Sequence, residues 1–120
     1  ELGVKVHNGG TYVCTEGPRF ETAAEIAMFK QLGGHLIGMT SVPEVCLARE
    51  LGLCYANISI VTNYAAGIST DILTHSEVLE MMTNRIQQLR EVIMTSIKYI
   101  KEEPQCNCAR ILDEIGVMGK

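Results

Sequence analysis

The sequence lacks any apolar run that approaches the roughly 20 residues a helix needs to cross a membrane. It also lacks a positively charged segment followed by an apolar stretch and a small-residue cleavage site, which is the pattern of a secretory leader. We therefore expect no membrane contact and a cytoplasmic location.

Positive charge is scarce and dispersed. The 10 lysines and arginines are outnumbered by 14 aspartates and glutamates, which gives a formal net charge of −4. A nucleic-acid-binding domain needs clustered basic residues, so we expect no nucleic-acid partner. With 47% hydrophobic and 20% charged residues, the composition is typical of a globular chain with one core, either a single domain or part of one.

The five cysteines include no CxxC pair of the kind that binds structural zinc, and we expect no metal. Cys14, Cys46 and Cys54 lie in apolar segments, which predicts buried free thiols. Cys106 and Cys108 form a separate Cys-x-Cys pair near the end of the chain.

Apolar periodicity alternates between that of strands and that of helices. A strand or hairpin is predicted at residues 4–14, strands at 35–39 and 53–61, the last as a buried strand, and helices at residues 22–32, 42–51 and 75–101. The alternation predicts an α/β fold with a largely parallel or mixed sheet. Three helix starts carry a Ser/Thr-x-x-Glu capping box: Thr22 with Glu25, Ser41 with Glu44, and Thr74 with Glu77. The opening Glu-Leu-Gly resembles the end of a helix, so we expect the chain to be the second half of a domain.

All three predicted strand segments end in polar stretches that lead into a helix: TEGPRFE (residues 15–21), GMTSVPE (38–44) and VTNYAAG (61–67). In open α/β sheets, ligands bind beyond the carboxyl ends of the strands. Each segment is a weak signal alone, because a hydroxyl before Pro-Glu is usually a helix cap. Together they indicate a ligand site, in which Glu16 and Arg19 are expected to form a structural ion pair that braces the first turn.

The segments EGPRFETAAE, GMTSVPEV with LARELGLCYA, and TNYAAGI with THSEVL resemble the trimeric and hexameric purine nucleoside phosphorylase and methylthioadenosine phosphorylase family. The resemblance covers about residues 7–100 and implies an enzyme that exchanges a purine on ribose C1′ for phosphate, without a further cofactor. It implies a three-layer α/β fold with a mixed central sheet, of which residues 1–120 are the C-terminal half and 103–120 a tail. It also implies a homotrimer or homohexamer, with a neighbouring subunit closing the site.

The resemblance assigns the purine to Phe20, Glu21 and Asn63. Phe20 packs on the base and ribose, and Glu21 accepts a hydrogen bond from N1–H of a 6-oxopurine. Asn63 bridges N7 and O6 and stabilises the charge on the base as the glycosidic bond breaks, so it is the expected catalytic residue. Without the resemblance, Phe20 is a core residue, Glu21 an acid favoured by a helix dipole, and Asn63 a partner of neighbouring backbone groups.

The same resemblance places Met39 and His75 at the ribose and Thr40 at the phosphate. The Thr40 hydroxyl precedes a helix start, which favours anions. His75 lies in a first helical turn, where the dipole disfavours the imidazolium and leaves a neutral ring to bond the 5′-hydroxyl. The alternatives are a core position for Met39 and a solvated side chain for His75. His7 and His35 are expected to be structural.

The Glu21 carboxylate and the Asn63 amide suit a 6-oxopurine, so the predicted reaction is phosphorolysis of inosine or guanosine to the free base and ribose 1-phosphate. An S-methyl-5′-thioinosine or 5′-methylthioadenosine phosphorylase is the close alternative. A third possibility is an inactive truncated chain that binds purine or acts only as a subunit.

For Cys106 and Cys108 the sequence leaves two interpretations open. Heat-stable archaeal members of the family carry a similar Cys-x-Cys and use disulfides, and hyperthermophiles are the exception to a reduced cytosol. The alternative is a pair of exposed thiols in a loose tail.

Overall fold

The computed structural model describes residues 3–69 and 75–111. Its elements follow in the order β1 (Tyr12–Cys14), α1 (Ala23–Gln31), β2 (Leu36–Gly38), α2 (Ser41–Glu50), α3 (His75–Ile97) and a 3-10 turn η1 (Cys108–Arg110). The chain is therefore α/β, as the alternating periodicity predicts.

The two strands form a parallel pair with α1 as the crossover between them, and the register matches Tyr12 to Leu36 and Cys14 to Gly38. Close packing holds this unit together. The Tyr12 ring lies where a Cβ on Gly38 would stand, and a Cβ on Gly34 would lie 2.7 Å from Val13 Cγ2. Only glycine fits at these two places without moving the neighbouring side chains.

Helix α1 begins as predicted. The Thr22 side chain accepts a hydrogen bond from the Glu25 backbone N–H, and the Glu25 carboxylate accepts one from the Thr22 backbone N–H. This reciprocal pair satisfies two backbone donors that the first turn of a helix leaves open. At the other end, Gly33 takes a φ of +85°, a conformation that favours glycine and ends the helix.

The predicted capping box of α2 is wrong. The helix begins at Ser41, so its N-cap is Thr40, whose side chain makes no capping hydrogen bond. Ser41 is buried inside the first turn. Glu44 instead accepts a hydrogen bond from the Tyr55 hydroxyl at 3.1 Å, so it braces the segment that follows α2 rather than capping the helix. The box predicted for Thr74 and Glu77 lies outside the described residues.

Two of the strand predictions are wrong: one strand is shorter than predicted and the other does not form. Only residues 12–14 of the predicted strand 4–14 pair, because Gly9 and Gly10 take positive φ values and break the extended backbone before them. Residues 53–61 form no strand, and large apolar side chains such as Leu53 and Val61 are 54% and 62% exposed. Within the described residues the sheet has only β1 and β2, so this segment runs without a strand partner.

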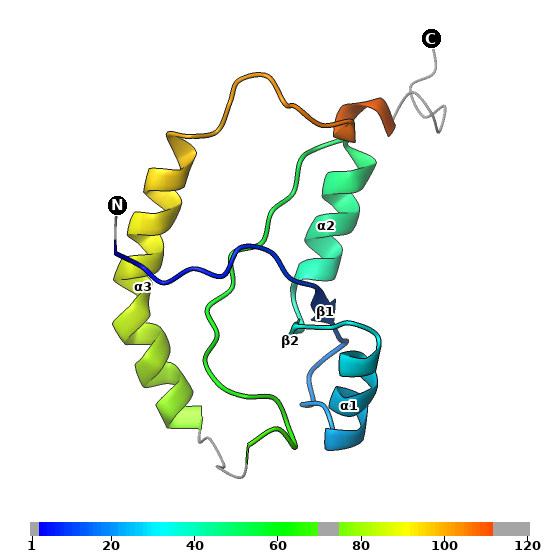
Figure 1. The fold of residues 1–120 in the computed structure, drawn as a ribbon, viewed down its shortest axis with the longest axis vertical. Coiled ribbons are helices and arrows are strands. Elements are labelled where there is room, and N and C mark those ends of the chain that lie inside the picture. The colour runs from blue at the N-terminus through cyan, green and yellow to red at the C-terminus, as the bar shows by residue number, and fades with distance from the viewer. Residues whose placement is uncertain (1–2, 70–74, 112–120) are drawn as a thin grey trace.

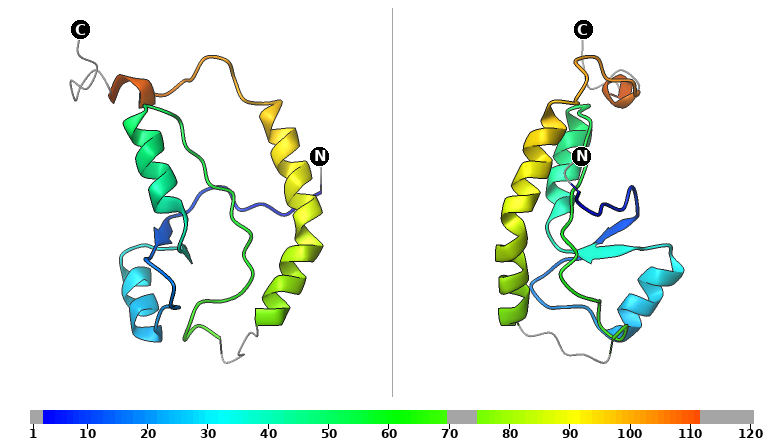
Figure 2. Two further views of the ribbon diagram at one scale, coloured as in Figure 1. Left: turned by 180° about the vertical axis from the view of Figure 1, so that it is seen from behind. Right: turned by 60° about the vertical axis from the view of Figure 1, so that its left-hand side comes forward.

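Figure 1 shows α1 and α2 close to the short sheet, with α3 standing apart and residues 53–69 running between the two parts. The left view in Figure 2 shows the same separation, and η1 lies near the end of α2 that leads into this segment. Among the described residues, Ile26 is the only buried apolar side chain. The two-stranded sheet and three helices thus leave most of their apolar surface uncovered.

The described residues include no helix long and apolar enough to cross a membrane. All five cysteines are free thiols. The prediction that the first three are buried is wrong for Cys46 and Cys54, which are exposed, while Cys14 is partly covered. An apolar sequence neighbourhood predicts burial, but within the described residues Cys46 on α2 and Cys54 in the segment after it remain exposed.

Candidate active site

The parallel arrangement of β1 and β2 brings two of the three polar segments to one edge of the sheet. Their carboxyl ends lie side by side, with Cys14 opposite Gly38. Just beyond them, the Thr15 backbone N–H donates to the Gly38 carbonyl at 2.8 Å. The corner after β1 and the corner after β2 are therefore bound together at the position where α/β proteins bind ligands.

Glu21 is held at this edge. Its carboxylate accepts a hydrogen bond from the Thr15 hydroxyl, and its side chain is partly buried. Met39 lies against the same corner, because a Cβ on Gly17 would be 3.0 Å from its Sδ atom. The structure therefore brings Glu21 and Met39 to one end of the sheet.

Phe20 is not a core residue. It precedes Glu21 on the corner and its side chain is 83% exposed. An aromatic ring that stays exposed to water adds little to the stability of the fold. The interpretation of Phe20 as a core residue is therefore wrong. The ring projects from the same corner that carries the Glu21 carboxylate.

Arg19 has a different partner from the one predicted. It forms a two-point ion pair with Glu25, with Nη2 to Oε1 at 2.6 Å and Nη1 to Oε2 at 3.0 Å, rather than pairing with Glu16. The geometry explains the choice, since Glu25 is already fixed by the capping box and offers both oxygens to the guanidinium. Hydrogen bonds from Arg19, and then from Thr22, lower the pKa of Glu25 to about 2.

This pair predicts a pH response. Because the pKa of Glu25 in the folded chain lies below its ordinary value of 4.5, its contribution to α1 is present above pH 4.5 and is lost as the pH falls toward 2. Carbon NMR of the Glu25 carboxyl should show a midpoint near 2, and Arg19→Gln should raise it. Lys30→Gln, which removes another cation of α1, should leave it unchanged. A midpoint near 4.5 in the unmodified chain would contradict the pairing.

Thr40 follows β2 and is the N-cap of α2. Its side chain is exposed and makes no capping hydrogen bond. A helix N-terminus presents backbone N–H groups and the positive end of its dipole, and a hydroxyl not used for capping can add a further donor there. The position is compatible with an anion.

Asn63 lies on the segment that faces the sheet. Its Oδ1 accepts from the Thr62 hydroxyl at 2.6 Å and its Nδ2 donates to the Tyr64 carbonyl at 2.9 Å, so its amide bonds to neighbouring residues. The loop that follows is packed tightly on the start of α1, since a Cβ on Gly67 would lie 2.6 Å from Ala23 Cβ. Through this contact the third polar segment reaches the helix that begins just after Glu21.

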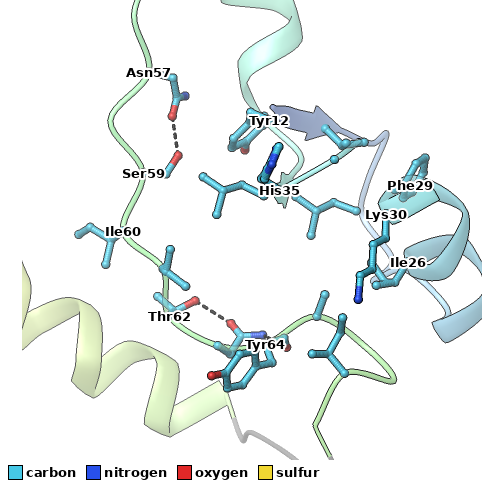
Figure 3. A pocket seen from close by; sticks show the side chains of 18 of the residues that line it. Tyr12, Ile26, Phe29, Lys30, His35, Asn57, Ser59, Ile60, Thr62 and Tyr64 are labelled. Atoms are coloured by element: carbon cyan, nitrogen blue, oxygen red, sulfur yellow. Dashed lines mark hydrogen bonds between the residues drawn. The ribbon is translucent and has the colours of Figure 1, made fainter. Parts of the chain in front are cut away.

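A hollow of about 670 Å³ separates residues 57–68 from the sheet and α1. In Figure 3, Tyr12, His35 and Lys30 lie on one side and Ile60, Thr62 and Tyr64 on the other. Thr40 and Asn63 both line the hollow, whereas Phe20, Glu21 and Met39 do not. Since apolar side chains supply most of its walls, we interpret it mainly as a gap between the sheet and an unpaired segment.

The predictions for His35 and His75 have different outcomes. His35 Nδ1 accepts a hydrogen bond from the Thr11 backbone N–H at 3.1 Å, so His35 braces the start of β1, as expected of a structural residue. The backbone of His75 begins α3, but its side chain lies outside the described part of the chain. The structure therefore brings Glu21, Met39 and Thr40 to one edge, brings Asn63 to the hollow with Thr40, and leaves the role of His75 a prediction.

Sequence reasoning missed one cluster of chemistry-bearing residues. Cys54 lies beside Cys106 and Cys108, and the sulfurs of Cys54 and Cys106 are 3.1 Å apart and share a hydrogen bond. Hydrogen bonding to Cys106 and then Cys108 raises the pKa of Cys54 to about 11, while the Cys108 backbone N–H lowers that of Cys106. No sequence signal joins Cys54 to the Cys-x-Cys pair, because Cys54 and Cys106 are 52 positions apart in the chain.

A comparison with protein families matches residues 1–98 to the phosphorylase superfamily. The chain belongs to this superfamily. A probable 6-oxopurine nucleoside phosphorylase of Dictyoglomus turgidum is 58% identical over 114 residues, which are 95% of this chain and 43% of the relative. The 6-oxopurine nucleoside phosphorylase of Pyrococcus furiosus is 55% identical over 107 residues, which are 89% of this chain and 40% of the relative.

Other members of the superfamily carry different names. A probable S-methyl-5′-thioinosine phosphorylase of Methanothermobacter thermautotrophicus is 53% identical, over 89% of this chain and 38% of the relative. Among solved structures, methylthioadenosine phosphorylase from Schistosoma mansoni in complex with adenine is similar, with a TM-score of 0.73 and 33% identity over 90% of this chain and 38% of that one. The chain thus spans about 40% of the length of the relatives it matches.

Proposed function

We propose that the protein carrying this chain is a 6-oxopurine nucleoside phosphorylase, which converts inosine or guanosine and phosphate to the free base and ribose 1-phosphate. The proposal rests on the arrangement at the edge of the sheet. There the Thr15 hydroxyl holds the Glu21 carboxylate beside the corner that bears Met39 and Thr40. The names of the relatives agree with this chemistry.

In the proposed reaction, phosphate attacks ribose C1′ while the bond from C1′ to purine N9 breaks. The transition state carries positive charge on the ribosyl group and negative charge on the departing base, and the protein accelerates the step by placing and stabilising both. Thr40 would donate to phosphate at the start of α2, and Met39 would lie against the ribose. Glu21 would accept from N1–H of the base, with Phe20 packed on its face.

Asn63 is the proposed catalytic residue. Its amide would donate to O6 and interact with N7, where negative charge develops as the base leaves. To reach the base it would exchange its bonds to Thr62 and Tyr64 for bonds to the ligand. The contact of Gly67 with Ala23 supports this assignment, because it ties the Asn63 loop to the helix that begins beside Glu21.

We further propose that residues 1–120 are the C-terminal part of a single phosphorylase domain, with 103–120 as its tail. In that domain a three-layer arrangement with a mixed central sheet would cover the apolar side chains exposed on residues 53–61 and on α3. A homotrimer or homohexamer in the cytoplasm, with a neighbouring subunit closing the site, completes the proposal.

A second candidate is phosphorolysis of S-methyl-5′-thioinosine, favoured by the 53% identity to a probable enzyme of that name. The two candidates differ at the 5′ position of the ribose. His75, proposed to bond a 5′-hydroxyl, favours the unmodified nucleoside, since a methylthio group needs an apolar wall.

The test is an assay of the protein carrying this sequence with phosphate and, in turn, inosine, S-methyl-5′-thioinosine and 5′-methylthioadenosine. The release of hypoxanthine and ribose 1-phosphate from inosine at the highest kcat/KM is the expected result. A preference for a methylthio substrate would favour the second candidate. Binding of hypoxanthine without turnover of any substrate would contradict both and indicate a chain that only binds purine.

Replacing Thr40 by valine should raise the KM for phosphate about tenfold, which corresponds to about 1.4 kcal/mol for one hydrogen bond to a charged group. The KM for inosine should change little, because the Thr40 hydroxyl is placed at the phosphate. Ser41→Ala removes the neighbouring hydroxyl and serves as a control. It is a weaker control than a substitution at an exposed position, because Ser41 is buried within α2. An unchanged phosphate KM in Thr40→Val would remove Thr40 from the site.

A further inference from the structure

We propose that Cys54, Cys106 and Cys108 form a binding site for a thiophilic metal ion, such as Zn²⁺, that fastens the segment after α3 to the end of α2. The three sulfur atoms all lie within 4.8 Å of one another. The cluster lies outside the edge of the sheet that carries Glu21, and the proposal does not depend on the phosphorylase assignment.

The spacing of the sulfurs fits one ion among them. In a tetrahedral zinc site with Zn–S bonds of about 2.3 Å, the ligand sulfurs stand about 3.8 Å apart. The shortest separation here is 3.1 Å, between Cys54 and Cys106, and the longest is within 4.8 Å. Shifts of about 1 Å in these three side chains would bring the sulfurs to the distances that the ion requires.

Three thiols that converge are better explained by a metal than by a disulfide. A disulfide joins two sulfurs and would leave the third unpaired beside it. A Cys-x-Cys pair can bind one ion through both sulfurs, and Cys54 from a distant part of the chain supplies the third. Thiolate ligands select soft or borderline ions, which excludes Mg²⁺ and Ca²⁺ as occupants.

The exposure of the cluster permits loading and leaves room for a fourth ligand. Cys54 and Cys106 are exposed and Cys108 is partly covered, so an ion can reach the sulfurs from solvent and a water molecule can complete its coordination. Each thiol would release its proton to solvent on binding, so affinity should rise with pH.

The position of the cluster gives the ion a structural role. Cys54 follows α2 after a three-residue connection, and Cys106 and Cys108 lie at η1, beyond α3. Figure 2 shows η1 near the end of α2. An ion here would close a loop of 52 residues that includes all of α3, and long loops are those whose closure constrains the unfolded chain most.

The experiment uses the protein carrying this sequence, reduced and stripped of metal, and titrates it with Co²⁺ and then Zn²⁺. Thiolate-to-cobalt charge-transfer absorption should appear with about one ion per chain and should be lost on displacement by Zn²⁺. Cys54→Ser, Cys106→Ser and Cys108→Ser should each weaken binding by roughly a hundredfold or more. Zinc should also raise the thermal unfolding midpoint of the unmodified protein and not that of the three variants.

Cys46→Ser is the matched control, because Cys46 is an exposed thiol on α2 outside the cluster. It should retain the cobalt spectrum and the zinc-dependent stabilisation. The proposal is overturned if the reduced protein gives no charge-transfer absorption, or if Cys46→Ser loses it as fully as the cluster variants do. It is also overturned if, in air-saturated buffer with zinc present, dissolved oxygen oxidises Cys54 and Cys106 to a disulfide, seen as the loss of two hydrogens from the intact mass, instead of the protein retaining the ion.

Discussion

Glu21→Ala is expected to lower kcat/KM for inosine by about a hundredfold, which corresponds to about 2.7 kcal/mol of transition-state stabilisation. The loss is large because the substitution removes a charge-assisted hydrogen bond to N1–H of the base. A steady-state assay of hypoxanthine release measures it. The same substitution should have a smaller effect on adenosine, whose N1 carries a lone pair and offers Glu21 no proton.

Two control variants separate recognition by Glu21 from support of the corner. Thr15→Val removes the hydroxyl that donates to the Glu21 carboxylate but keeps the carboxylate, so it should cost less than Glu21→Ala. Glu25→Gln removes the neighbouring acid, which is bound to Arg19 and Thr22, and should affect α1 more than the reaction. If Glu25→Gln lowers kcat/KM as much as Glu21→Ala does, Glu21 acts through the corner and not through the base.

Asn63→Asp should shift the preference between inosine and adenosine toward adenosine by about tenfold to a hundredfold. The amide donates to the O6 acceptor of a 6-oxopurine, whereas a carboxylate accepts from the N6 amino group of adenine, so one matched contact is lost and another gained at about 1.4 kcal/mol each. The ratio of kcat/KM values for the two nucleosides is the measurement.

Asn57→Asp is the control for this second prediction. Asn57 lines the same hollow, and its substitution also changes an amide to a carboxylate. Its side chain accepts a hydrogen bond from the Ser59 hydroxyl, and the proposed mechanism assigns it no contact with the base. The nucleoside ratio should not move in this variant. If Asn63→Asp lowers both activities without changing their ratio, Asn63 does not distinguish the 6 position.

Most features that depend on a few consecutive residues are predicted well by the sequence, the capping box of Ser41 and Glu44 being the exception. The capping box of Thr22 and Glu25, the stop of α1 at Gly33 and the short strand within residues 35–39 are confirmed. Each rests on hydrogen bonds or backbone conformations within about four residues, so the chain near the feature contains all of its causes.

Predictions that required a distant partner were less successful. The buried strand at residues 53–61 and the buried thiols Cys46 and Cys54 are wrong, because burial and pairing depend on what covers a segment. Proximity along the chain predicts that Arg19 pairs with Glu16, whereas the fixed carboxylate of Glu25 offers the better two-point geometry. Of the candidate site residues, Glu21, Met39 and Thr40 follow the predicted ends of β1 and β2, while Asn63 depends on a loop whose contact with α1 was not foreseeable.

The sequence by itself determined the α/β class, the positions of the helices and the polar corners that carry the phosphorylase resemblance, since periodicity and short motifs encode these locally. Only the tertiary structure decided that the corners after β1 and β2 are bound together through Thr15 and Gly38. It alone also brought Cys54 to Cys106 and Cys108. The physical reason is that such contacts join segments 23 to 52 residues apart, where the path of the chain in space, and no local propensity, decides which groups meet.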